Sequence, residues 1–154
     1  MAETEASPTA AVEQTPPPAV ASKPHPRRRR LALLLLALLV AYASLHPLTG
    51  WRDNGVPVFD YLGAAWPRYY TGFDLVTNII AYLPFGFFCT AALRHRLAPL
   101  SAWAVAVALG GGLSLVMEWL QNYLPNRVPS NLDLACNAAG TLLGGMIGAT
   151  WGAH

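Results

Sequence analysis

The chain has 154 residues, of which 54% are apolar and only 12% are charged. An average soluble domain carries roughly 25% charged residues, so this composition argues against a water-soluble domain and indicates one small membrane domain with a polar tail. The formal net charge of +2 comes from a basic cluster at positions 23–30 without interleaved aromatic residues. That pattern excludes a typical nucleic-acid interface and is better explained as a topology signal.

The first 30 residues form a polar segment rich in proline and alanine that ends in the basic run Arg27–Arg30. Residues 1–26 contain six prolines, no aromatic residue, and neither a helical nor a strand-like period. Such a segment cannot bury enough apolar surface to offset the entropy lost on ordering. We therefore expect residues 1–30 to be a disordered cytoplasmic tail.

An apolar stretch at about residues 31–48 follows the basic run and is long enough to cross the hydrocarbon core as a helix. Within it, Ala41-Tyr42-Ala43 also resembles a signal-peptidase site that follows a short apolar region. The long polar tail in front favours a retained helix over a cleaved signal peptide.

Residues 50–73 form a loop rich in aromatic residues, in which two acidic and two basic side chains balance. Aromatic rings with polar tips favour the headgroup level, so we expect this loop to lie on the membrane surface. We interpret it as an interfacial anchor, with a lid that contacts a substrate as the alternative.

Three further apolar segments predict transmembrane helices at about 74–93, 99–124 and 132–151. Pro99 is well placed to begin the second of them. Together with the first segment, they predict an all-α membrane domain of four transmembrane helices in residues 31–152.

Helix-packing residues stand out in the second and fourth predicted helices. Pro84 and Gly86 can weaken or kink the helix at 74–93. Gly140, Gly144 and Gly148 lie at four-residue spacing, which is specific for tight helix contact. The partner of this glycine ridge is either another helix of the chain or a second copy, so a homodimer through the ridge is one prediction.

The basic residues predict how the helices are oriented. In a four-helix arrangement Lys23, Arg27–Arg30, Arg94 and Arg96 fall on one side, and Arg52, Arg68 and Arg127 fall on the other. The positive-inside tendency then places both termini in the cytoplasm. At about 1.5 Å of rise per residue, Cys89 and Cys136 lie at depths too different for a disulfide, so both are expected to be free core thiols.

Polar residues gather near the outer ends of the last three predicted helices. By helical rise, they converge at one level, and the spacing puts those of each helix on a single face. The converging residues are Asp74, Asn78, Glu118, Gln121, Asp133 and Asn137. Ionisable groups in membrane segments are costly, so this cluster is a site hypothesis by default.

Structural roles compete with this hypothesis. Asp133 could cap the fourth helix, and Arg127 could pair with Glu118 or Asp133. Asn78 and Asn137 could instead bond across helices as polar contacts. Glu118 is the residue for which a purely structural role is least expected, since its carboxyl group lies about 10 Å below the interface.

The same residues carry a family resemblance. The spacings N-x5-P-x-G from Asn78, S-x3-E-x2-Q from Ser114 and R-x5-D-x3-N-x2-G from Arg127 resemble the VanZ-like family of bacterial membrane proteins. The resemblance covers about residues 30–152 and leaves the tail outside the family pattern. It implies a four-helix protein of the bacterial cytoplasmic membrane, and the namesake of the family lowers susceptibility to the glycopeptide antibiotic teicoplanin. It implies no established reaction.

We favour a binding function without a known catalytic motif. The hypothesis is that a lipid-linked envelope precursor, glycolipid or other cell-surface ligand is recognised at the outer leaflet, with Arg127 meeting an anionic headgroup. Membrane lipids are the other expected partners. The candidate ligand-binding residues are Asn78, Ser114, Glu118, Gln121, Arg127, Asp133 and Asn137.

Two other function classes remain open. A small membrane enzyme acting on a lipid or glycan would use Glu118 and Asp133 as an acid–base pair. Transport would need a dimer, because four short helices leave little room for a pathway. We expect no cofactor and no metal site, since the histidines are scattered, although oxygens of Glu118 and Asp133 could hold a cation.

Overall fold

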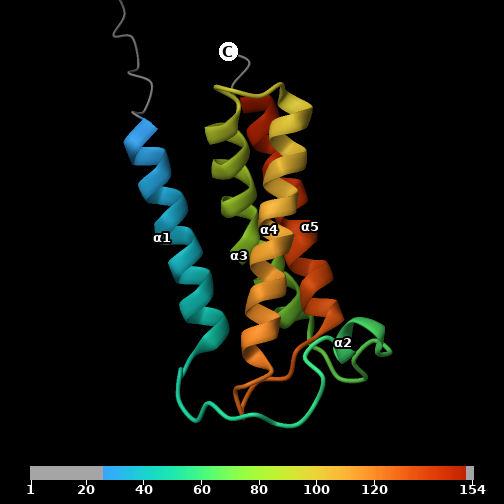
Figure 1. Ribbon diagram of the computed structural model, residues 1–154. Coiled ribbons are helices and arrows are strands. Elements are labelled where there is room, and N and C mark those ends of the chain that lie inside the picture. The colour runs from blue at the N-terminus through green and yellow to red at the C-terminus, as the bar shows by residue number, and fades with distance from the viewer. Residues whose placement is uncertain (1–25, 152–154) are drawn as a thin grey trace, which may run out of the picture.

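The computed structural model describes residues 26–151, and every regular element within them is a helix. The expected all-α architecture is therefore confirmed, while the expected disorder of the tail concerns residues outside the described range, apart from 26–30. In chain order the helices are α1 (Pro26–Leu45), α2 (Asp60–Gly63), α3 (Gly72–Leu93), α4 (Pro99–Gln121) and α5 (Asn131–Trp151) (Figure 1).

Three helix boundaries differ from the expected ones by three residues or more. The helix expected at 31 already begins at Pro26, because proline is favoured in a first turn and arginine is a good helix former. It ends at Leu45 rather than 48, since the residue before Pro47 is disfavoured in a helix. The helix expected to reach 124 ends at Gln121, because the next residues form tight turns ahead of Pro125.

Within residues 26–151, three helices are long and apolar enough to cross a membrane, namely α3, α4 and α5. In α1, a shorter apolar helix spans Arg30–Leu45. The chain is thus a multi-pass membrane protein by helix length and hydropathy, with three of the four expected spans meeting the criterion. Large apolar side chains on all four helices point away from the bundle, as contact with lipid requires.

The most extensive helix contact joins α3 to α5. A methyl group added at Gly140 or Gly144 would overlap the carbonyl oxygen of Ile79 or Leu83, so the two backbones nearly touch. The glycine ridge therefore has its partner within the same chain. A homodimer through this ridge, as the sequence suggested, would have to displace α3.

From the other side of the contact, Gly86 lies against the backbone of Thr141, and Gly148 lies against the carbonyl oxygen of Phe87. Pro84 stands inside α3, which runs without a break from Gly72 to Leu93. Gly86 thus serves the helix packing that the sequence predicted.

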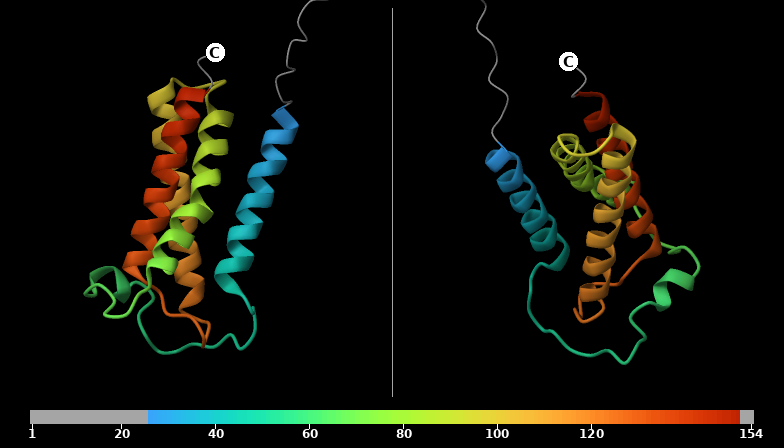
Figure 2. Two further views of the ribbon diagram at one scale, coloured as in Figure 1. Left: turned by 180° about the vertical axis from the view of Figure 1, so that it is seen from behind. Right: turned by 45° about the horizontal axis from the view of Figure 1, so that its top comes forward.

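The first helix stands beside this three-helix unit and diverges from it toward its beginning (Figures 1 and 2). Its Val40 and Leu45 pack with Tyr82 of α3 and Met117 of α4. Nearer the beginning of α1, Leu33 packs against the cluster around Phe85. Apolar side chains along α1 therefore pack it against α3 and α4.

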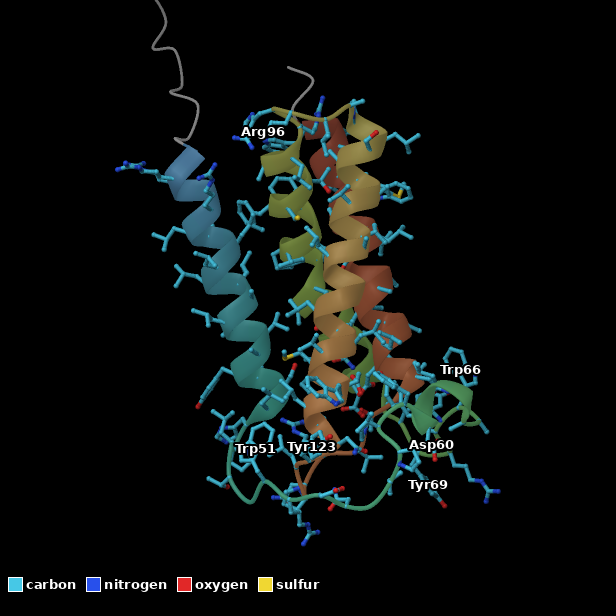
Figure 3. The ribbon with its side chains drawn as sticks, in the orientation of Figure 1. Trp51, Asp60, Trp66, Tyr69, Arg96 and Tyr123 are labelled. Atoms are coloured by element: carbon cyan, nitrogen blue, oxygen red, sulfur yellow. The ribbon has the colours of Figure 1, made fainter. Side chains whose placement is uncertain are left out.

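The aromatic loop and the α3–α4 connection lie at opposite ends of the bundle. Figure 3 shows Trp51, Trp66 and Tyr69 at the end opposite to Arg96. Side-chain amides hold the loop to the α4–α5 connection, because Asn54 donates to the carbonyl oxygen of Asn122 at 2.8 Å. Asn131 likewise donates to the carbonyl oxygen of Ala64 at 2.7 Å.

Both cysteines are free and buried, as expected.

Candidate ligand-binding site

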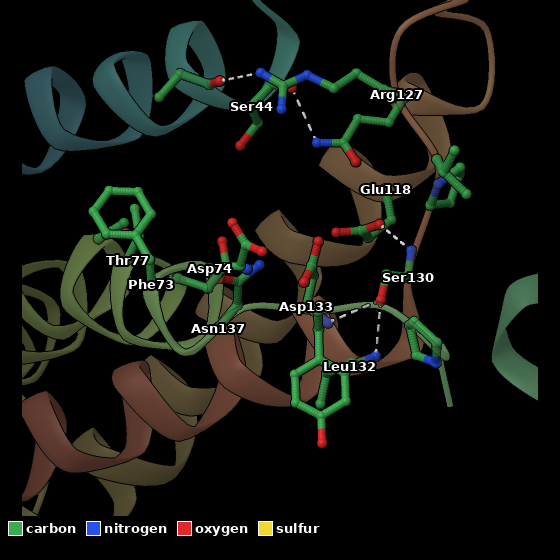
Figure 4. Close-up of a pocket in the computed structure, with 18 of the residues that line it drawn as sticks. Ser44, Phe73, Asp74, Thr77, Glu118, Arg127, Ser130, Leu132, Asp133 and Asn137 are labelled. Carbon is green, nitrogen blue, oxygen red and sulfur yellow. Dashed lines mark hydrogen bonds between the residues drawn. The ribbon is translucent and has the colours of Figure 1, made fainter. Parts of the chain in front are cut away.

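A cavity of about 630 Å³ opens at the aromatic-loop end of the bundle, between α1, α3, α4, α5 and the two loops (Figure 4). Six of the seven candidate ligand-binding residues line it, as does Asp74. The six are Asn78, Glu118, Gln121, Arg127, Asp133 and Asn137. The seventh, Ser114, is fully buried and does not belong to the lining.

Glu118 is the most deeply buried carboxyl residue of the cavity, with only 2% of its surface exposed. Its carboxylate accepts a hydrogen bond of 2.7 Å from the backbone N–H of Ser130. A buried carboxylate needs such a partner, because its desolvation is costly. The bond also fixes which way the side chain points.

Ser130, and not Asp133, caps α5. The Ser130 hydroxyl oxygen accepts from the backbone N–H groups of Leu132 at 3.2 Å and Asp133 at 3.3 Å. The alternative in which Asp133 is the cap is therefore wrong. Serine one position before a helix, with an acidic residue three positions on, is a known N-terminal pattern that could have identified this cap from the sequence.

Three carboxyl groups, those of Asp74, Glu118 and Asp133, point toward a common space in Figure 4. Asp74 is committed elsewhere: it forms a capping box with Thr71, whose backbone N–H and hydroxyl both donate to it. Asp74, which the sequence placed in the polar cluster, thus has a structural role at the start of α3. In the described part of the chain, no group of three or more His, Cys, Asp or Glu is arranged to hold a metal ion.

Below the carboxyl groups, Asn137 joins α5 to α4. Its Nδ2 donates to the hydroxyl oxygen of Ser114 at 2.9 Å. Ser114, the candidate residue that does not line the cavity, therefore lies directly behind a residue that does. The other amide atom of Asn137, Oδ1, is buried without a hydrogen-bond partner among the described residues. The hydroxyl of Tyr82, another residue that lines the cavity, is likewise buried without a hydrogen-bond partner among the described residues.

Arg127 is engaged with the end of α1. Its Nη2 donates to the carbonyl oxygens of Ala43 at 3.0 Å and His46 at 3.2 Å, and its Nε donates to His46 at 3.3 Å. These carbonyls belong to the last turn of a helix, where they lack partners within the helix. Arg127 therefore acts as a C-terminal cap supplied from a distant segment.

Gln121 works in the same way, since its Nε2 donates to the carbonyl oxygen of Ser44 at 3.0 Å. Together Arg127 and Gln121 form what we call the α1 latch. Sequence reasoning placed both residues in a ligand site and did not foresee this contact.

Apolar residues complete one side of the cavity. Val40 and Ala43 of α1 face Phe73, Thr77 and Ala81 of α3 across it. Several of these, among them Ala43 and Thr77, are exposed at the bundle surface. The cavity therefore communicates with the surroundings of the bundle between α1 and α3.

Tyr61 of α2 marks a second hollow of about 550 Å³, on the other side of the α4–α5 connection. Its hydroxyl is buried without a partner among the described residues. Burial raises the pKa of this phenol, with the charge of Glu118 as a smaller cause. Sequence reasoning assigned Tyr61 only to the membrane surface.

Comparison with known proteins gives one match. The model of the VanZ/LLP1 family matches residues 14–151. The match begins earlier than the sequence pattern suggested, so part of the proline-rich segment falls within it. No curated protein and no solved structure matches the chain significantly.

Proposed function

The chain belongs to the VanZ/LLP1 family of membrane proteins, and from this premise we propose that it binds the polar head of a lipid-linked or cell-surface ligand at the outer leaflet. One observation carries the proposal: a single cavity combines a polar deep end with an apolar side between α1 and α3. Ligand sites are typically concave, mostly apolar and supplied with a few convergent polar groups. An amphiphile matches this cavity, with its polar head at the deep end and its apolar part between α1 and α3.

The placement in the outer leaflet rests on charge. Arg27, Arg28 and Arg30 begin α1, and Arg94 and Arg96 follow α3, so basic residues gather at the end of the bundle far from the cavity. By the positive-inside tendency, that end is cytoplasmic, and so are both termini. This orientation makes α1 the fourth span and puts the cavity at the outer surface.

Filling the cavity tests the proposal. Thr77 lines the cavity, whereas its neighbour Val76 is exposed outside it. We expect Thr77→Trp to lose lipid that co-purifies with the wild type, measured by mass spectrometry of the intact protein in mild detergent. Val76→Trp adds the same ring to the lipid-facing side and should retain it. Equal retention by both variants would contradict binding in this cavity.

The family makes teicoplanin susceptibility the phenotype to examine. A host without this protein would receive empty vector, wild type, Glu118→Ala, or Asp53→Ala as a control in the exposed loop, at matched membrane abundance. We expect wild type and Asp53→Ala to lower susceptibility and Glu118→Ala to fail. If inserted wild type gives no protection, the resistance role does not belong to this chain.

An acid–base function of the same cavity is the second candidate. It is favoured by the common position of Glu118 and Asp133, with Glu118 nearly excluded from solvent. Product formed from a lipid or glycan by the purified wild type, and abolished in Glu118→Gln, would support it. Retained binding without turnover would favour recognition alone.

A further inference from the structure

The deep end of the cavity is rich in hydrogen-bond acceptors. Asn137 is 5% exposed, and its Oδ1 has no partner among the described residues. The carboxyl groups of Glu118 and Asp133 line the same cavity. The carboxylates are acceptor-only and can take further donors beside those they have, the Ser130 N–H for Glu118 and the Asn78 side chain for Asp133. The Asn137 amide oxygen, by contrast, has no donor within residues 26–151. The unpaired Tyr82 hydroxyl, 2% exposed, can also accept.

Donor groups of Asn137, Gln121 and Arg127 are bound to other parts of the protein. The Asn137 amide nitrogen donates to Ser114, and the Gln121 amide nitrogen donates to the end of α1. Two of the three guanidinium nitrogens of Arg127 donate to carbonyl oxygens of the same helix end. The Gln121 amide and the Arg127 guanidinium, which could bind an anion, thus donate to backbone carbonyl oxygens, while acceptor oxygens line the cavity.

Charge points the same way. The lining contains three carboxyl groups and two guanidinium groups, and Glu118 is the deepest of the five. The other arginine, Arg68, is exposed in the loop at the mouth. A negative group at the deep end would be repelled by Glu118 and Asp133, a cost that a positive group would not have.

From these acceptors we propose that the cavity selects an amphiphile whose headgroup carries a primary ammonium group. The ammonium would donate to Glu118, Asp133 and the Asn137 amide oxygen, since it offers three N–H donors and one positive charge. Its acyl part would lie between α1 and α3. This inference rests on the proposed function, because it names the ligand class of the same cavity.

Lipids that differ only in the headgroup test the proposal. Full-length protein in nanodiscs would be offered phosphatidylethanolamine, its N-acetylated derivative, phosphatidylcholine and phosphatidylglycerol with identical acyl chains. Bound lipid would be counted by native mass spectrometry. We expect about a tenfold preference for phosphatidylethanolamine over the N-acetylated lipid, as for loss of a charge-assisted hydrogen bond. Phosphatidylcholine, which keeps the positive charge without N–H donors, should bind as weakly as the N-acetylated lipid.

Isosteric variants connect the preference to the acceptors. Glu118→Gln and Asp133→Asn should each lower the preference several-fold, whereas Asp53→Asn removes the same charge from the exposed loop and should leave it intact. Phosphatidylglycerol bound best, or a preference unchanged in both cavity variants, would overturn the inference.

The two proposals fail in different ways. If all four lipids bind equally and Thr77→Trp removes them all, the cavity binds lipid but does not select an ammonium group. If Thr77→Trp removes none of them, the cavity is not the lipid site, and the proposed function falls together with this inference.

Discussion

The backbone N–H of Ser130 donates to the carboxylate of Glu118 over 2.7 Å, so the residue that caps α5 also orients the deepest acid of α4. One short connection thereby sets both the start of a helix and the floor of the cavity. Stability and the geometry of the site are coupled at this point.

The capping hydroxyl can be removed without its backbone N–H. Ser130→Ala should lower the free energy of unfolding by about 1 kcal/mol, the usual effect of losing an N-terminal cap. Ser130→Thr keeps a hydroxyl and should restore most of the loss. Denaturation in mixed detergent micelles measures both, and a Ser130→Ala variant as stable as the wild type would contradict the cap.

The glycine ridge should be intolerant of a single methyl group. Gly144→Ala overlaps the backbone of Leu83, and overpacking of this kind costs about 1–3 kcal/mol. Gly112→Ala is the matched control, because nothing lies within 4 Å of an added methyl group there. It should be neutral or stabilising by up to about 1 kcal/mol, since alanine is the better helix former. Similar losses in both variants would mean that helix contact is not the cause.

The α1 latch predicts that Arg127→Gln loosens α1. Spin labels at Leu39 and Ile80, both exposed, would report the distance between α1 and α3 in a chain without its native cysteines. We expect a broader distribution in Arg127→Gln, because the last carbonyls of α1 lose their donor. Arg52→Gln should leave the distribution unchanged, since the side chain of Arg52 bonds to Asn54 in its own loop and not to α1 among residues 26–151. Identical distributions in all three proteins would refute the latch.

Orientation can be read from cysteine labelling in intact cells. With an impermeant maleimide, Tyr69→Cys should react at once, because that side chain is 94% exposed on the proposed outer side. Arg96→Cys should react only after the membrane is opened. The wild type is the control, since Cys89 and Cys136 are buried and should stay unlabelled until the protein is denatured. The reverse pattern would invert the topology.

The helices were largely predictable because their signals are local. Pro99 begins α4 at the expected residue, and apolar length alone located α3 and α5 within two residues. The convergence of Asn78, Glu118 and Asp133 on one cavity also followed from helical rise and face. The boundaries of α1 were less predictable, since a basic run can either extend a helix or precede it.

The role of Arg127 could not be derived from spacing. Its partners, Ala43 and His46, lie more than eighty residues earlier, and a helix end exposes the same carbonyl groups whatever its sequence. Only the docking of α1 decides which donor reaches them. The cap at Ser130 could, by contrast, have been predicted from the sequence, because a serine with an acidic residue three positions on is a local signal.

Beneath the cavity, Ser114 and Thr141 are completely buried, and Asn137 links their helices. Ala106 is equally inaccessible one level deeper. This packing closes the axis of the bundle below the cavity, so a molecule that enters the cavity cannot leave through the opposite end of the bundle. In a single copy the cavity is therefore closed at its deep end, and transport would require the helices to separate or a second copy to contribute.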